Sequence, residues 1–173
     1  MNPLERHSRG SGSSKTEASR LPVARLTALL GGGLREGEIG RICGKAGVGK
    51  SSLLVQLALE RLFKGEGVIH ISPRYSPQHV RDQYDSILEG QLHGLRPLER
   101  SELLLLVERH RVIHAMRGTP LSKERVINLV ETAQQLMEFQ TRLVVVDGWE
   151  PEAPNILAEQ LQAHGISLWY TAL

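Results

Sequence analysis

Residues 44–51 of this 173-residue chain read G-K-A-G-V-G-K-S and fit the pattern G-x-x-x-x-G-K-[ST] at every fixed position. The glycines allow the backbone to curl so that successive amide groups point toward the oxygens of a bound phosphate. An apolar strand pattern precedes the segment and an amphipathic helical pattern follows it, so the positive end of the helix dipole would point at the same oxygens. The segment therefore predicts a phosphate-binding loop, and the fold must join a strand to a helix through it.

The end of this segment supplies the charge and the metal ligand of a nucleoside triphosphate site, a Walker A motif. Lys50 reaches the β and γ phosphates and is the first catalytic candidate, while the Ser51 hydroxyl is a candidate Mg²⁺ ligand. ATP with Mg²⁺ is the predicted ligand, because the sequence lacks the N-K-x-D segment that reads guanine. The predicted nucleotide-binding residues are Gly44, Lys45, Ala46, Gly47, Val48, Gly49, Lys50, Ser51 and Ser52.

From Leu21 onward, short apolar runs alternate with helical patterns, which is typical of repeated strand–helix units. Such units predict an α/β fold with a central parallel sheet of about five strands, right-handed crossovers and helices on both faces. We expect strands at 38–43, 68–71, 112–116, 143–147 and 166–170, and helices at 50–64, 77–88, 103–110, 123–139 and 152–163.

Serine residues mark several of the expected helix starts. Ser76 before Pro77 suits an N-cap followed by the first helical position, and Ser122 suits a second N-cap. Ser101 suits the cap of the short helix that follows it, although the leucine run of that helix also suits a strand. Residues 89–97, which are rich in glycine and end in proline, are expected to form a loop.

An acidic residue ends the most apolar of the expected strands. The run at 143–146 shows no alternation of polar and apolar residues, as expected of a strand buried on both faces of a parallel sheet. Asp147 comes directly after it, about a hundred residues beyond the phosphate-binding loop. A carboxylate in this position can hold a water molecule bound to Mg²⁺. Asp147 is therefore the predicted acid of the metal site, together with Ser51.

The sequence resembles the RecA/RadA/KaiC family of P-loop ATPases, and the KaiC–RadA branch more than RecA itself. Residues 26–38, LTALLGGGLREGE, are similar to the LDxLLGGGLxxGE segment that precedes the loop in that branch, and residues 71–80, ISPRYSPQHV, resemble a strand ending in SxEESPEQL. The resemblance covers most of residues 22–173. It implies a RecA-like fold, ATP hydrolysis, and self-association into rings or filaments.

The sequence departs from the pattern of that family at important positions. The family's catalytic acid, which orients or deprotonates the attacking water, falls on Arg74 and Tyr75, and neither side chain can act as a carboxylate base. The aspartate of the segment before the loop is Thr27 here. The sequence also ends at Leu173, where family members carry further strands. We therefore expect ATP binding with inefficient hydrolysis.

Two polar residues near the expected strand ends are candidates for the general base and for a polar sensor of the γ phosphate. Glu150 follows Asp147 by three residues and is the candidate substitute base, the second catalytic candidate. Thr171, expected just after the last strand, is the candidate polar sensor near the γ phosphate.

The predicted function is ATP binding with slow or partner-dependent hydrolysis, in the role of a regulatory switch. One alternative is a recombination or repair accessory that binds DNA in an ATP-dependent way. Another is a scaffold that is gated by nucleotide, binds protein partners and does not hydrolyse ATP, which the residues at 74 and 75 favour. A homo-oligomer is implied by the resemblance, and a monomer or dimer stays open. The basic candidates for DNA contact are Arg96, Arg100, Arg117, Lys123 and Arg125.

Composition bounds the remaining properties. Residues 1–20 are rich in serine, glycine and charge and are expected to be a disordered tail, which leaves residues 21–173 as the ATPase domain. Aromatic residues make up only 4% of the chain, which speaks against a stacking platform for single-stranded nucleic acid. A single cysteine, Cys43, and no long apolar run predict a cytoplasmic protein that does not enter a membrane. Cys43 itself is expected to be a buried small apolar residue.

Overall fold

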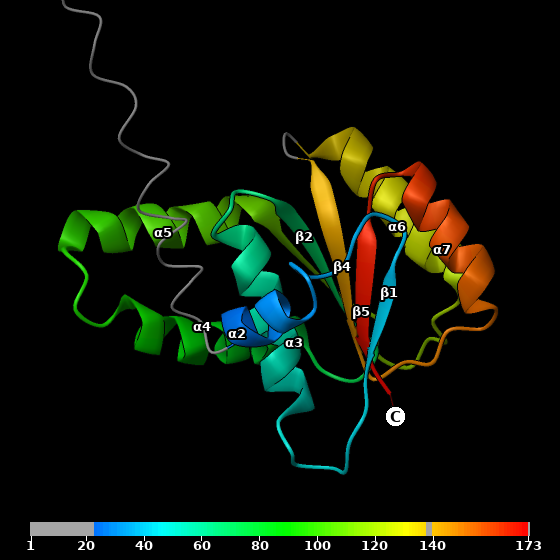
Figure 1. Cartoon of the computed structure of the whole chain (residues 1–173), viewed down its shortest axis with the longest axis horizontal. Helices are drawn as coiled ribbons and strands as arrows, with labels where there is room; N and C mark the ends of the chain where they lie inside the picture. The colour runs from blue at the N-terminus through cyan, green and yellow to red at the C-terminus, as the bar shows by residue number, and fades with distance from the viewer. Residues whose placement is uncertain (1–22, 138–139, 173) are drawn as a thin grey trace, which may run out of the picture.

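The computed structural model of the protein describes residues 23–137 and 140–172. The expected tail at 1–20 and the expected helix end at Phe139 lie outside these ranges. One parallel five-stranded sheet forms the centre, with the strand order β1-β5-β4-β2-β3 (Figure 1). The strands are β1 (Ile39–Ile42), β2 (Gly67–Ser72), β3 (Arg111–Ala115), β4 (Thr141–Asp147) and β5 (Ser167–Thr171).

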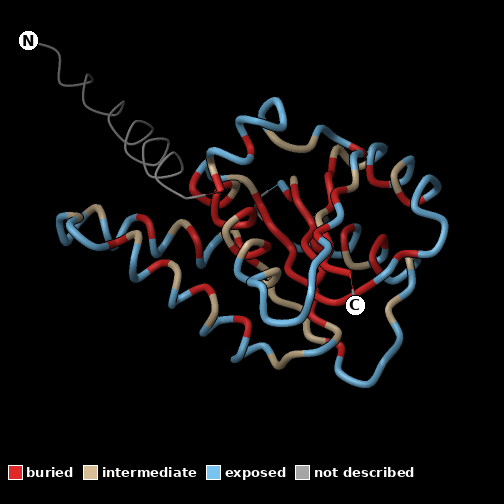
Figure 2. The backbone as a smooth tube through the Cα atoms, turned by 60° about the horizontal axis from the view of Figure 1, so that its bottom comes forward, coloured by how far each residue is buried: buried red, intermediate tan, exposed pale blue. Residues whose placement is uncertain are grey.

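Helices cover both faces of the sheet (Figure 1). One face carries α3 (Lys50–Leu62), α4 (Pro77–Leu92) and α5 (Pro97–His110), with α2 (Val23–Leu29) packed on α3, and the other carries α6 (Lys123–Leu136) and α7 (Pro154–Ala163). The strands are buried between these layers, and the outer helix faces and loops are exposed (Figure 2). The predicted fold class, a RecA-like parallel α/β sheet, is confirmed. Within the described ranges, no helix has both the length and the apolarity needed to cross a membrane.

Side-chain alternation in β4 shows how one strand serves two cores. Leu143 and Val145 pack in the cluster that includes α3, whereas Val144 and Val146 pack in the cluster that includes α6 and α7. A strand in the interior of a parallel sheet has helices on both sides, so it has no polar face, as the sequence predicted. By the same alternation, Asp147 at the end of β4 lies on the α3 side of the sheet.

The segment between β2 and β3 is more helical than the sequence indicated. α4 continues through Gly90 to Leu92, and α5 begins at Pro97, so the loop expected at 89–97 is confined to residues 93–96. A helix tolerates an internal glycine at a cost of about 1 kcal/mol, which tertiary packing offsets here. Leu92, at the end of α4, is buried in the α3-side cluster.

The start of α5 also corrects a sequence prediction. The carboxylate of Glu99 accepts a hydrogen bond from the backbone N–H of Arg96 at 3.1 Å, and this contact begins the helix. Ser101 therefore lies inside α5 and is not its cap. Leu103 and Val107, one turn apart, are buried, so the leucine run forms the buried stripe of a helix and not a strand.

Two predicted helix caps are confirmed. The Ser76 hydroxyl accepts the backbone N–H of His79 at 3.2 Å, and Pro77 is the first residue of α4. The Ser122 hydroxyl accepts the backbone N–H of Arg125 at 3.3 Å at the start of α6.

A histidine is fully buried in β2, between β3 and β4. Nδ1 of His70 lies 3.1 Å from the Tyr84 hydroxyl of α4, and the Arg111 guanidinium lies over the Tyr84 ring at 4.6 Å. Burial is the main cause that lowers the pKa of His70 to about 4; the charge of Asp147 opposes this shift and the charge of Arg111 adds to it. His70 is therefore a neutral packing residue at neutral pH.

The lowered pKa of His70 predicts acid sensitivity of the fold. The unfolded chain binds this proton more readily than the folded protein, so stability is lost as the pH falls below the ordinary pKa of 6.5. We expect the loss to reach about 3 kcal/mol near pH 4. Urea denaturation between pH 4 and pH 7 measures it, with His70→Gln as a variant that cannot titrate. Equal pH slopes of the unfolding free energy in the two proteins would contradict the prediction.

Candidate functional site

The glycine-rich loop at residues 43–49 connects β1 to α3 at the carboxyl edge of the sheet and is exposed. Gly47 and Gly49 have φ angles of +77° and +93°, a region that side chains other than glycine rarely adopt. A Cβ at Gly44 would lie 2.9 Å from the side chain of Val48, so the loop also closes tightly at its start. The glycines are therefore required by backbone conformation and by close approach.

The helix that follows the loop leaves its first amide groups available. α3 begins after Gly49, receives no side-chain cap, and has no acidic residue in its first turn. The starts of α4 and α6, in contrast, are capped by Ser76 and Ser122. Uncapped N–H groups and the positive end of the helix dipole together make the α3 start suitable for an anion.

Lys50 lies across the loop. Its Nζ donates to the main-chain carbonyl oxygen of Gly44 at 2.6 Å and approaches that of Lys45 at 3.4 Å. An ammonium group has three protons, so a donor remains for a phosphate oxygen even while the group contacts the loop. The next residue, Ser51, is half-buried, and Ser52 is exposed.

Asp147 combines a buried carboxylate with one unpartnered oxygen. The residue is 3% exposed, and its Oδ1 accepts a hydrogen bond from the Thr171 hydroxyl at 2.7 Å. Its Oδ2 is buried and has no hydrogen-bond partner among the described residues. Leaving a buried polar atom unpaired costs about 1–3 kcal/mol or more for a charged group. The residues present thus fit a Mg²⁺-bound water at Oδ2, with the β and γ phosphates at Lys50 and the α3 start.

Glu150 lies on the other side of the sheet. Its carboxylate forms an ion pair with Arg41 of β1 at 3.1 Å, and both side chains are 51% exposed. Arg41 precedes Ile42, which packs in the α3-side cluster, so alternation directs Arg41 toward the α7 side. Glu150 also borders a cavity of ≈ 400 Å³ together with Lys123 and Trp149. The structure brings Glu150 to Arg41 and not to Asp147.

Thr171 and Cys43 differ from their expected places. Thr171 is the last residue of β5, paired with Asp147 of β4, and does not lie beyond the strand. Cys43 is exposed, although burial was expected. The reason is that β1 ends at Ile42, so Cys43 belongs to the loop and not to the sheet.

The positions of the family's catalytic acid lie just after β2. Arg74 is exposed, and its guanidinium lies 5.6 Å from the centre of the Tyr75 ring. The Tyr75 ring stacks on His79 at 4.5 Å. These two residues therefore place a cation and an aromatic ring, and no carboxylate, at this part of the carboxyl edge.

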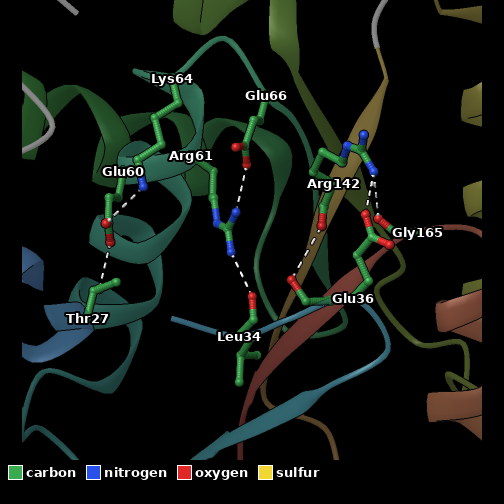
Figure 3. A network of polar contacts seen from close by, with 10 residues as sticks. Thr27, Leu34, Glu36, Glu60, Arg61, Lys64, Glu66, Arg142 and Gly165 are labelled. Carbon is green, nitrogen blue, oxygen red and sulfur yellow. Dashed lines mark hydrogen bonds and ion pairs between the residues drawn. The ribbon is translucent and has the colours of Figure 1, made fainter. Parts of the chain in front are cut away.

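A polar network joins the segment before β1 to the far end of α3 (Figure 3). The Thr27 hydroxyl donates to Glu60 at 2.7 Å, and the guanidinium of Arg61 donates to the carbonyl oxygen of Leu34 at 2.9 Å. Sequence reasoning treated Thr27 only as a departure from the family pattern. Its contact with Glu60 fixes α2 against α3, which the 33-residue separation did not indicate.

The basic candidates for DNA contact do not form one surface. Arg96 lies at the turn between α4 and α5, where it pairs with Glu99, and Arg100 follows in α5. That turn and the loop after β3, which carries Arg117, lie at opposite ends of the view in Figure 1. Lys123 pairs with Glu124 at 3.1 Å at the start of α6, near Arg125.

Comparison with known proteins identifies one family and one relative. Residues 11–151, most of the chain, match the family described as AAA domain. A protein of Campylobacter jejuni subsp. jejuni serotype O:2 named DNA repair protein RadA is 37% identical over 62 residues. That match covers 36% of this chain and only 14% of the relative, so it concerns a small part of the RadA protein.

Asp147→Asn is expected to weaken Mg²⁺-dependent binding of a triphosphate by about 10- to 100-fold. The amide oxygen can still accept the hydrogen bond from Thr171, but an NH₂ group then replaces one carboxylate oxygen and the charge is lost. Titration with a fluorescent ATP analogue, in Mg²⁺ and in EDTA, measures the effect. Equal weakening under the two conditions would show that Asp147 does not act through the metal.

Proposed function

The chain belongs to the AAA domain family of nucleotide-binding P-loop ATPases, and we propose that it binds ATP with Mg²⁺ and hydrolyses it slowly, or only with a partner, as a regulatory switch. In this proposal residues 44–52 bind the nucleotide, and Lys50 meets the β and γ phosphates. Ser51 ligates Mg²⁺, and Asp147 holds a water of the ion. Residues 21–173 form the ATPase domain, in the KaiC–RadA branch of the RecA/RadA/KaiC family.

The observation that carries this proposal is the buried Oδ2 of Asp147, for which the described residues provide no hydrogen-bond partner. It lies on the α3 side of the sheet, the side of the helix that begins with Lys50 and Ser51. A buried carboxylate oxygen without a donor is costly, and a metal-bound water supplies the donor. Mg²⁺ is bound in proteins through one or two carboxylates together with substrate phosphates, which is the set of ligands available here.

The proposal of slow hydrolysis rests on the groups that would activate water. Arg74 and Tyr75 offer no carboxylate, and a general base must lie within hydrogen-bond reach of the water. Glu150 is engaged by Arg41. An exposed ion pair is worth about 0–1 kcal/mol, so a bound partner can separate it at little cost. Hydrolysis would then depend on a partner that separates this ion pair and also brings Glu150 within hydrogen-bond reach of the attacking water.

The named role of the Campylobacter jejuni relative favours a second function, ATP-dependent DNA binding. Arg117 and Arg125 lie in or just after the loop that follows β3, at the carboxyl edge of the sheet. A third function, a nucleotide-gated scaffold without turnover, is favoured by the cation at position 74. The three functions share the nucleotide site and differ in turnover and in the response to DNA.

Lys50→Ala is expected to weaken ATP binding by about 100-fold, because two charge-assisted contacts to phosphate are lost. Lys64→Ala, just beyond the other end of α3, is the control that also removes a lysine charge and is expected to keep the wild-type affinity. Calorimetry with Mg²⁺ and a non-hydrolysable ATP analogue measures binding, and phosphate release from ATP, with and without DNA, measures turnover. Wild-type affinity in Lys50→Ala would overturn the site. Turnover stimulated by DNA would select the repair function, and tight binding without turnover would select the scaffold.

Arg74→Glu is expected to raise ATP turnover at least about tenfold if the missing carboxylate limits the reaction, since a general base contributes about 10²–10⁴-fold. Arg74→Gln removes the cation without adding a base and is expected to leave turnover within about twofold of wild type. Single-turnover phosphate release compares the three proteins. An equal rise in the two variants would show that the positive charge, and not the missing base, limits hydrolysis.

A further inference from the structure

The hydroxyl of Thr171 uses its single proton at the end of β4. Its Oγ1 donates to Oδ1 of Asp147 at 2.7 Å and accepts the backbone N–H of Gly148 at 2.7 Å. The carbonyl oxygen of the same residue accepts the backbone N–H of Trp149 at 3.0 Å. Thr171 is 1% exposed, so these bonds are shielded from water. The last residue of β4 and the two residues that follow it are thereby held by a single residue of β5.

The single proton of the Thr171 hydroxyl cannot serve Asp147 and a bound phosphate at the same time. A threonine hydroxyl has one proton, and the oxygens of a triphosphate only accept hydrogen bonds. Because the proton of Thr171 is given to Asp147, Thr171 cannot donate to a γ phosphate without releasing the carboxylate. A role as a sensor that contacts the phosphate would therefore break the buried bond.

The carboxylate of Asp147 needs a partner to fix its orientation. The terminal torsion of an aspartate side chain is broad, so the group turns readily when nothing anchors it. Thr171 is the one hydrogen-bond donor to this carboxylate among residues 23–137 and 140–172. With Oδ1 anchored, the orientation of Oδ2 is fixed as well, at a position where no described residue donates a hydrogen bond to it.

We propose that Thr171 is a positioning residue for the metal site: its hydroxyl anchors Oδ1 of Asp147 so that Oδ2 meets a water of the Mg²⁺ ion. The inference rests on the proposed ATP and Mg²⁺ binding and adds a residue that acts through Asp147. Residues that orient a metal-binding group in this way typically change metal affinity by about 10- to 100-fold when they are replaced. Nucleotide binding without metal does not need this orientation.

The experiment compares Thr171→Val, which removes the hydroxyl at nearly constant shape, with Thr171→Ser, which keeps it. Thr141→Val is the matched control, because Thr141 is a buried threonine at the other end of β4 whose hydroxyl has no hydrogen-bond partner within the part of the chain that the structure describes. Binding of a fluorescent, non-hydrolysable ATP analogue is measured over a range of Mg²⁺ concentrations and in EDTA. Thermal unfolding confirms that each variant is folded, and Thr171→Ala replaces Thr171→Val if the valine variant is not.

Thr171→Val is expected to raise the Mg²⁺ concentration for half-maximal binding by about tenfold or more, with binding in EDTA within about twofold of wild type. Thr171→Ser and Thr141→Val are expected to retain the wild-type Mg²⁺ dependence. In an Asp147→Ala background, Thr171→Val should have no further effect, because the two residues act as a unit.

An unchanged Mg²⁺ dependence in Thr171→Val, or the same weakening in EDTA as in Mg²⁺, would overturn the positioning role. Failure of the serine variant to restore the wild-type dependence would also overturn it. Failure of the proposed function is distinguishable, because wild type and Lys50→Ala would then bind the analogue equally. If wild type and Thr171→Val bind the analogue with the same Mg²⁺ dependence, the positioning role is rejected while the proposed ATP and Mg²⁺ binding stands.

Discussion

The parallel pairing of β4 with β5 is the contact on which the candidate site depends. It places Asp147 opposite Thr171, so a buried carboxylate finds its donor on the neighbouring strand. Without this donor, a charged oxygen that is removed from water would remain unpaired at a cost of several kcal/mol. The apolar residues of β4, buried on both faces, hold the strand in place and thereby hold the carboxylate on the α3 side.

The far end of α3 explains how the loop can be exposed and yet correctly placed. α3 is attached to α2 through the buried bond between Thr27 and Glu60, and to the segment before β1 through Arg61 and Leu34 (Figure 3). These contacts lie at the end of the helix away from the phosphate-binding loop. A helix fixed by its buried face and its last turn keeps its first amide groups at a constant position, although the loop itself packs against little.

Local signals in the sequence predicted the loop, the strands and two of the caps. Gly47 and Gly49 mark positions where the backbone has a positive φ angle. Ser76 and Ser122 each accept a hydrogen bond from the backbone N–H three residues further along the chain. The bounds of α5 were not predictable in this way. Leu103 and Val107 form a buried helical stripe only because they pack against the α3-side core, and that contact is not visible in the local sequence. The exposure of Cys43 likewise follows from where β1 ends, which residue types alone do not fix.

The parts of the site that escaped prediction depend on strand order. β5 lies between β1 and β4, so it brings Thr171 to Asp147, 24 residues away in sequence. The opposite face of the same edge brings Glu150 to Arg41, 109 residues away. Alternation along the strands then separates the two carboxylates onto different sides of the sheet, one buried and one half-exposed. In the proposed function, metal and nucleotide bind on the α3 side, while Glu150, the candidate base, stays on the other side of the sheet. Nucleotide binding without hydrolysis can still shift a conformational equilibrium if the two conformations differ in their affinity for the nucleotide. This separation of the two carboxylates supports the proposed switch, in which the protein responds to ATP and hydrolyses it slowly.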